Sequence, residues 1–180
     1  MTSEANGWRT EAAKDSKTQL AELYDEYYDR IAHYAYVRIG DRTQAEDISS
    51  EVFLKALESI KKYQERGLPM QAWLFRIAHN LVVDHLRGMR RHEVISIDSI
   101  KIRDESDPEV DMERKMELER LTEAIKKLTE KQREVLRLRF FGGLTSKEGG
   151  NLLNKSDGAV REMQRAALEK LRELMAEGQS

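Results

Sequence analysis

The 180-residue chain carries 33 acidic and 31 basic residues, which give a net charge of −2, and only two prolines and ten glycines. Charged residues make up 36% of the chain and apolar residues 39%, a balance that favours helices around small cores over a strand-rich fold. The absence of cysteine excludes disulfides and thiolate metal sites. No apolar run approaches the ~20 residues of a membrane span, and the N-terminus lacks the apolar core of a signal peptide. We therefore expect an all-α, soluble, cytoplasmic protein without a membrane span.

The small net charge hides an alternation of acidic and basic blocks. Residues 18–63 carry nine acidic and six basic side chains, whereas residues 64–92 carry two and five. Residues 93–113 carry eight and two, and residues 114–180 carry eleven and fifteen. Because salt screens charges over ~8–10 Å, each block acts locally. The alternation predicts two cationic regions separated by an acidic connector.

Two amphipathic helices are predicted in the first third of the chain. Residues 1–17 are polar and without period, and we interpret them as a flexible tail. Thr18 is the predicted N-cap of the first helix, which ends near Gly40. A capping box of Thr43 and Glu46 is predicted to open the second helix.

The second helix has a predicted buried stripe and an acidic face. The buried stripe comprises Ile48, Val52, Ala56 and Ile60. Asp47 and Glu51 lie off this stripe, and two large apolar side chains, Phe53 and Leu54, flank it. From the residues alone, these two fit either additional core or an interface.

The stretch from Met70 to Arg91 combines an apolar and a cationic helical face. Its predicted helix, residues 72–87, has an apolar stripe of Leu74, Ile77, Ala78, Leu81 and Leu86. Another face carries Arg76, Asn80, Asp84 and Arg87, and two further cations, Arg90 and Arg91, follow. This pattern suits binding to a polyanion, and an ordinary solvated helix shows it as well. With the two preceding helices and the loop at 63–71, it predicts a three-helix domain over residues 18–92.

An acidic extended linker is predicted over residues 93–113, and a second small helical domain over residues 114–180. Three signals define the helices of this second domain. Capping boxes pair Thr129 with Gln132 and Thr145 with Glu148, and the glycines at 142–143 end the helix between them.

The last third of the chain predicts a helix-turn-helix. A short helix is predicted from Thr145 to Leu153, followed by a turn at Asn154 and a last helix over Asp157–Leu174 capped by Ser156. A helical hairpin with no DNA role has the same spacing.

Both predicted domains resemble extracytoplasmic-function sigma factors. AEDISSEVFLKAL (45–57) and AWLFRIAHNLVVDHLR (72–87) are similar to region 2 of that family. LTEKQREVLRLRFFGGLTSKE (128–148) and KSDGAVREMQRAALEKLR (155–172) are similar to region 4. The resemblance implies a dissociable subunit that binds bacterial core RNA polymerase and recognises promoter DNA. It implies no catalytic residue, cofactor or metal, and an anti-sigma factor as a further partner.

The resemblance also assigns roles by position. It implies that the helix over 45–60 docks on the clamp helices of the largest polymerase subunit, through Asp47, Glu51, Phe53 and Leu54. The helix over 72–87 and the loop before it are expected to bind the non-template strand of the −10 element and help to melt it. The residues expected there are Arg76 and Asn80, with Arg87, Arg90 and Arg91 assigned on charge alone. The last helix is expected to read the −35 element through Arg161, Glu162, Gln164 and Arg165.

Four positions depart from the family's pattern. Gly149-Gly150 stands where the family usually has an aliphatic residue followed by alanine, Asn154 where a turn glycine is common, and Ala166 where many members have a basic residue. A glycine inside a helix costs about 0.8–1 kcal/mol relative to alanine. We therefore expect a marginal second domain whose short helix over 146–153 is irregular or frays.

Two other classes of protein are weighed against this resemblance. A helix-turn-helix regulator that acts without polymerase needs a dimerisation surface or a ligand domain, and residues 18–92 offer neither. An enzyme using His79, Asp84 and His85 is disfavoured, because histidines six residues apart do not share a helical face. Promoter binding with and without core polymerase distinguishes the sigma factor from the regulator.

Overall fold

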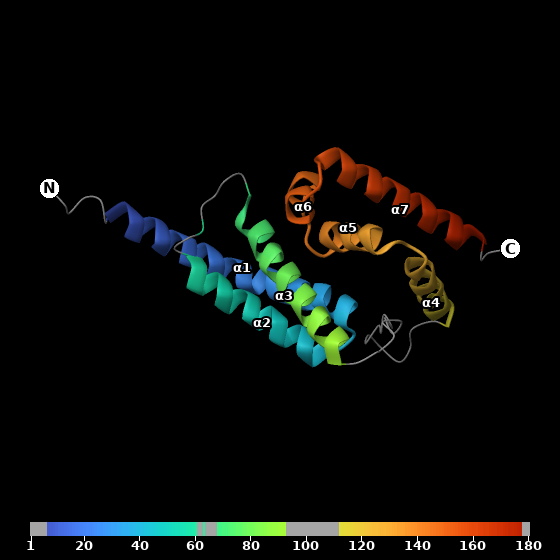
Figure 1. Cartoon of the computed structure of the whole chain (residues 1–180), viewed down its shortest axis with the longest axis horizontal. Coiled ribbons are helices and arrows are strands. Elements are labelled where there is room, and N and C mark those ends of the chain that lie inside the picture. Colours follow the sequence, from blue (N-terminus) through green and yellow to red (C-terminus); the bar gives the residue numbers. More distant parts are fainter. Residues whose placement is uncertain (1–6, 61–62, 64–67, 93–111, 178–180) are drawn as a thin grey trace. The chain divides into compact units, whose positions relative to one another are not determined.

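The computed structural model describes the chain except for residues 1–6, 61–62, 64–67, 93–111 and 178–180. Over the described residues the chain forms seven α-helices and no strand (Figure 1). The all-α expectation is therefore confirmed. The chain divides into two compact units, Met1–Val94 and Ile95–Ser180.

Three helices that pack pairwise form the first unit. They are α1 (Gly7–Ile39), α2 (Arg42–Ser59) and α3 (Met70–His92). Aromatic side chains join two of them, because the Phe75 ring of α3 lies edge-on to Tyr27 and Tyr34 of α1, with ring centroids 6.2 and 5.7 Å apart. Around this contact the core is mostly apolar and includes Ile31, Ala35, Ile48, Val52, Ala56, Leu74, Ala78 and Val82. The buried Ser49 hydroxyl donates to the Tyr28 carbonyl at 2.8 Å.

Both predicted starts of the first two helices are wrong. The first helix begins at Gly7 rather than after Thr18, because the intervening residues contain good helix formers and no proline. It ends at Ile39, and Gly40 follows with φ 79°, a left-handed conformation that favours glycine. The N-cap of α2 is Asp41, whose carboxylate accepts the Gln44 N–H at 2.9 Å, so Thr43 lies inside the first turn.

The buried face of α3 is rotated relative to the predicted stripe. Leu74 and Ala78 are buried as expected, but their buried neighbours are Phe75 and Val82. The other predicted members, Ile77, Leu81 and Leu86, are only partly buried. The reason is that α3 packs against both α1 and α2, and Phe75 fills the space beside the α1 tyrosines.

Four helices form the second unit: α4 (Met112–Lys126), α5 (Glu130–Phe140), α6 (Ser146–Leu153) and α7 (Asp157–Glu177). Both predicted capping boxes are confirmed, at the starts of α5 and α6. The last helix packs against the other three, and the core contains Ala124, Leu128, Val135, Leu138, Leu144, Val160 and Ala167. Phe140 at the end of α5 is 64% exposed, and Leu144 in the following loop is fully buried.

The turn between α6 and α7 explains the second glycine of the pair. Asn154 ends α6 with φ 57°, and the Lys155 N–H donates to the Gly150 carbonyl at 2.8 Å. A Cβ atom on Gly150 would lie 2.6 Å from the Lys155 carbonyl oxygen, so the close return of the backbone requires glycine there. A Cβ atom on Gly149 would meet only Val160, at 4.0 Å. The helix is regular in the structure, and its fraying stays a prediction.

None of the described helices has the length and apolar character needed to cross a membrane.

Candidate functional site

The exposed side of α2 carries an acidic stripe with one large apolar side chain. Asp47, Glu51, Leu54 and Glu58 follow one another at spacings of four, three and four, which places them on one helical face, and all are exposed. Leu54 is 62% exposed, and Glu51 pairs with Lys55 at 3.2 Å. The structure thus brings three of the four predicted polymerase-binding residues, Asp47, Glu51 and Leu54, onto one face.

Phe53, the fourth of these residues, belongs to the core. It is only 7% exposed, and its ring lies edge-on to Tyr24 of α1 with centroids 4.9 Å apart. Phe53 follows the fully buried Val52, on the side of α2 that packs against α1. The apolar neighbour that α2 does expose is Leu57, 48% exposed and three residues after Leu54. Sequence analysis missed Leu57, although the spacing of the two leucines is a signal for a shared face.

The cationic face of α3 is exposed where the sequence predicts it. Arg76, Asn80 and Arg87 are all exposed, and Arg87 lies 3.6 Å from Asp84 of the same helix. Arg90 and Arg91 fall within the last turn of α3, but their side chains lie outside the described residues. The face therefore combines guanidinium groups with an amide that can both donate and accept hydrogen bonds.

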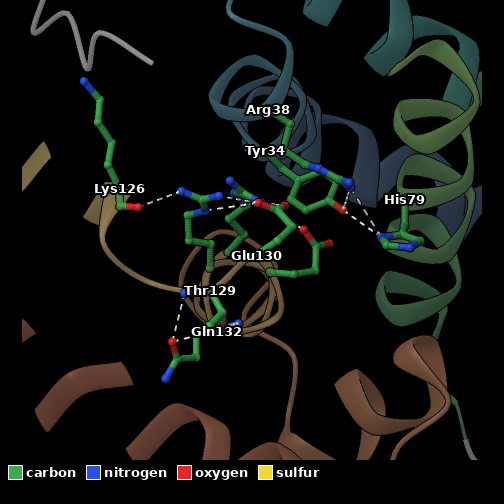
Figure 2. Close-up of polar contacts among 10 residues, drawn as sticks. Tyr34, Arg38, His79, Lys126, Thr129, Glu130 and Gln132 are labelled. Atoms are coloured by element: carbon green, nitrogen blue, oxygen red, sulfur yellow. Dashed lines mark hydrogen bonds and ion pairs between the residues drawn. The ribbon is translucent and has the colours of Figure 1, made fainter. Parts of the chain in front are cut away.

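A polar cluster behind this face fixes α3 against α1 (Figure 2). Arg38 donates to the Tyr34 hydroxyl at 3.0 Å, and that hydroxyl lies 3.0 Å from Nδ1 of His79. Because an arginine only donates, the Tyr34 oxygen accepts from Arg38, and the direction of its hydrogen bond with His79 depends on the tautomer of the imidazole. Tyr34 is fully buried, so the cluster fixes the orientation of His79 and of the adjacent Asn80. Among the described residues, no group of three metal-ligating side chains could hold a metal ion.

The loop before α3 is partly described. Tyr63 packs on Trp73 of α3, with ring centroids 4.9 Å apart, and its hydroxyl donates to the Leu68 carbonyl at 3.1 Å. These contacts fix the described ends of the predicted loop, 63–71, at the start of α3. Residues 64–67 of that loop lie outside the described residues.

The exposed face of α7 brings together the residues predicted to read DNA. A shallow groove on it is lined by Arg161, Gln164, Arg165, Leu168, Glu169 and Arg172. Arg161 pairs with Asp157 at 3.2 Å. Arg165 makes a two-point contact with Glu162, from Nε at 3.1 Å and from a terminal nitrogen at 2.6 Å, and also contacts Glu169 at 2.5 Å. The hydrogen bonds and charge of Arg165 hold the pKa of Glu162 below its ordinary value, so the pair stays ionised.

Gln164 differs from its neighbours because it is tied to another helix. Its Oε1 accepts a hydrogen bond from Nε of Arg139 in α5 at 3.0 Å, and Arg139 also donates to the carbonyl of Leu144. Sequence analysis missed Arg139, and no local signal points to a contact between residues so far apart in the chain.

A second cluster of charges fixes the start of α5 (Figure 2). Arg137, which is buried, contacts Glu130 at 2.7 Å and the buried Glu134 at 3.2 Å. Arg133 contacts Glu130 at 2.9 Å and donates to the Lys126 carbonyl at 3.3 Å. Burial raises the pKa of Glu130, but the two arginines outweigh it and hold that pKa below its ordinary value.

Two helical units, one with a cationic amide-bearing helix and the other with a helix-turn-helix, define a DNA-binding protein of two domains. The model of Sigma-70 region 2 matches residues 23–92, and the model of Sigma-70 region 4 matches residues 124–173. The chain belongs to the sigma-70 family and, within it, to the extracytoplasmic-function (ECF) RNA polymerase sigma factors.

Sequence relatives agree with this membership. The chain is 36% identical over 155 residues to the ECF sigma factor BldN of Streptomyces coelicolor, covering 85% of the chain and 59% of that relative. It is 30% identical over 175 residues to SigD of Mycobacterium tuberculosis, covering 93% of the chain and 82% of the relative.

Two solved structures share the fold. One is CnrH in complex with the cytosolic domain of CnrY, with 22% identity, a TM-score of 0.64 and coverage of 93% and 94% of the two chains. The other is the sigma factor RpoE in complex with the anti-sigma factor NepR from Bartonella quintana, with 18% identity, a TM-score of 0.67 and coverage of 88% and 97%.

Proposed function

We propose that this sigma factor binds core RNA polymerase and directs it to promoters through three separate helical faces, on α2, α3 and α7. The observation that carries this proposal is that each matched unit presents a polar helical face of the chemistry its task requires. The three tasks are polymerase docking, capture of the −10 strand and readout of the −35 element.

Polymerase docking is assigned to the exposed stripe on α2. Asp47 and Glu51 provide charge for a basic partner helix, and Leu54 provides apolar contact area between charged neighbours. Complementary charge steers and orients such an encounter, and apolar groups at the centre contribute most of the affinity. Leu57 extends the apolar part of this surface by one turn.

Capture of the −10 strand is assigned to α3. Arg76 and Arg87 can neutralise phosphates, and the Asn80 amide can hydrogen-bond the edge of an unpaired base. The cluster of Tyr34, Arg38 and His79 holds this face rigidly against α1, so that little side-chain freedom is lost when DNA binds.

Readout of the −35 element is assigned to α7, the second helix of the helix-turn-helix. Its first turns carry Arg161, Glu162, Gln164 and Arg165. All of these except Glu162 line one shallow groove. Such helices place their N-terminal turns against base edges in the major groove. In this proposal, the face of α3 binds the −10 element and the face of α7 reads the −35 element, and neither face depends on the other for its contacts.

An anti-sigma factor is proposed as a regulatory partner. The structural neighbour RpoE is in complex with the anti-sigma factor NepR, and CnrH is in complex with the cytosolic domain of CnrY. The site of action is the cytoplasm, where polymerase and promoter DNA are present. The polymerase supplies the chemistry of RNA synthesis, and this chain supplies binding only.

Transcription with purified core polymerase tests the proposal. We expect core enzyme plus the full chain to start RNA synthesis at a discrete set of promoters in genomic DNA, and core enzyme alone to start at none of them. Specific, high-affinity promoter binding by the chain without core polymerase would instead favour the polymerase-independent regulator.

A further inference from the structure

We propose that Arg139 is a positioning residue that fixes the amide of Gln164, so that this position of α7 selects guanine, which offers two hydrogen-bond acceptors, over adenine, which offers one. The inference rests on the proposed role of α7 at the −35 element and adds a rule for one base of it.

The geometry leaves one assignment for the Gln164 amide. Arg139 Nε lies 3.0 Å from the Gln164 side chain, and all nitrogens of an arginine are donors without acceptor capacity. The amide atom facing Arg139 must therefore be the oxygen, and the amide nitrogen points elsewhere. A flipped amide would set its N–H groups against the guanidinium, donor against donor.

Arg139 is itself held in place and does not follow the glutamine. Its terminal nitrogen donates to the backbone carbonyl of Leu144, a fully buried residue in the loop between α5 and α6. Both Arg139 and Gln164 are half-buried, which limits their rotamers. The core of the unit thus determines which end of the Gln164 amide faces the groove.

This orientation changes what a glutamine can read. Glutamine recognises adenine by accepting from N6 and donating to N7 at the same time, which requires both ends of the amide. With Oε1 of Gln164 occupied by Arg139, the NH₂ group provides two donors to the groove. Guanine offers two acceptors in the major groove, O6 and N7. Adenine offers one acceptor, N7, beside the N6 donor; thymine offers one acceptor, O4; and cytosine offers a donor. Guanine is therefore the best match.

The neighbouring side chains do not provide the same selection. Arg161 and Arg165 are engaged by Asp157, Glu162 and Glu169 of the same helix, whereas the tie of Gln164 runs to another helix. A change at Arg139 therefore acts on one base position and leaves the other contacts of α7 in place.

The test is selection of promoters by the holoenzyme. Core polymerase with the full chain binds a promoter library that is randomised in the −35 element and constant elsewhere, and bound DNA is sequenced. We expect one −35 position at which guanine exceeds adenine on the order of tenfold. The Arg139→Met variant frees Oε1, so adenine should gain on the order of tenfold against guanine at that position.

Two further variants make the result unambiguous. In Gln164→Glu, one carboxylate oxygen still accepts from Arg139, and Arg139 keeps its hydrogen bond to the Leu144 carbonyl. The second carboxylate oxygen replaces the NH₂ donor that faces the groove, so the base enriched at this position should change toward cytosine, which offers a donor. Arg133→Met is the matched control, because Arg133 also lies on α5 and bonds a backbone carbonyl, but at Lys126. It should keep the wild-type preference.

The inference is overturned if Arg139→Met and Gln164→Glu lower binding uniformly while every base preference stays as in the wild type. Arg139 would then have a structural role only. The Arg161→Ala variant separates this failure from failure of the proposed function. If it alters −35 selection, α7 still reads that element; if it leaves −35 selection unchanged as well, the assignment of α7 is wrong.

Discussion

The two adjacent glycines of α6 should respond in opposite ways to the same substitution. A Cβ atom at Gly149 would meet a single neighbour, Val160 Cγ1, at an ordinary contact distance of 4.0 Å. A Cβ atom at Gly150 would lie 2.6 Å from the Lys155 carbonyl oxygen and 3.5 Å from the Asp157 nitrogen. Replacing each glycine by alanine therefore tests the geometry of the helix-turn-helix with one methyl group.

For Gly149→Ala we expect a gain in stability. Alanine is favoured over glycine inside a helix by about 0.8–1 kcal/mol, and the methyl group enters a buried site without a clash. A gain of about 1 kcal/mol raises the melting temperature of a small domain by roughly 4–8 °C. The second unit should show this rise.

For Gly150→Ala we expect a loss, although the gain in helix propensity is the same. The Lys155 carbonyl cannot move away freely, because the N–H of the same residue donates to the Gly150 carbonyl at 2.8 Å. Overpacking against a fixed neighbour costs about 1–3 kcal/mol, which exceeds the gain in propensity. The turn should loosen and the melting temperature should fall.

The measurement must report on the second unit. Both tryptophans, Trp8 and Trp73, belong to the first unit, so their fluorescence does not follow this transition. Circular dichroism melts combined with hydrogen exchange of peptides from α6 and α7 do follow it. Protection of α6 should increase in Gly149→Ala and decrease in Gly150→Ala. Equal protection in the two variants, or a more stable Gly150→Ala, would refute the reasoning.

Three further predictions test the surfaces and the charge cluster of α5. The double charge reversal Asp47→Lys and Glu51→Lys should weaken binding to core polymerase, because losing one side of a desolvated charge pair costs ~2–5 kcal/mol of binding free energy. Folding of the chain should be unchanged. Undiminished co-purification of the double variant with core polymerase would contradict the proposed docking surface. Asn80→Ala should impair promoter opening, and Arg161→Ala should weaken −35 protection, by ~1–3 kcal/mol if it reads a base; loss of the same footprint in both would contradict the division of labour. The pKa of Glu130 is lower in the folded protein than its ordinary value. Ionised Glu130 therefore stabilises the second unit fully at pH values above the ordinary pKa, and this contribution is lost as the pH falls through the lowered pKa. Glu130→Gln should therefore flatten the acid side of the second unit's stability profile, and an unchanged profile would contradict the role of its arginine partners.

Features set by neighbours in the chain could be predicted from the sequence. The capping boxes at Thr129 and Thr145 need only residues three positions apart, and both are present in the structure. The same local reasoning placed the start of the second helix wrongly. Asp41 caps α2 and Thr43 does not, because the chain leaves α1 through the left-handed Gly40 and enters the next helix at once.

Features set by packing between helices could not be predicted in this way. The apolar pattern allowed Phe53 to be either core or interface, and the resemblance to the family assigned it to the interface. In the structure, Phe53 is buried against Tyr24 of α1 and belongs to the core. The tie between Arg139 and Gln164 joins residues 25 positions apart, so no periodicity within one helix reveals it. Leu144 is buried for a similar reason, since the loop folds back over α5.

The distribution of charge on α7 bears on when the protein can read DNA. Three arginines on this face of α7, the predicted reading residues Arg161 and Arg165 together with Arg172, stand beside three carboxylates, Asp157, Glu162 and Glu169, so the face is close to neutral. Non-specific affinity for DNA comes mainly from cations that neutralise phosphates, and carboxylates beside the groove oppose it. The free chain should therefore have low affinity for DNA in the absence of core polymerase. Docking through α2 would hold the second unit near the promoter at an effective concentration on the order of millimolar, where hydrogen-bond readout by residues such as Gln164 is sufficient. The charge pattern thus favours recognition of the −35 element by the holoenzyme over capture of DNA by the free sigma factor.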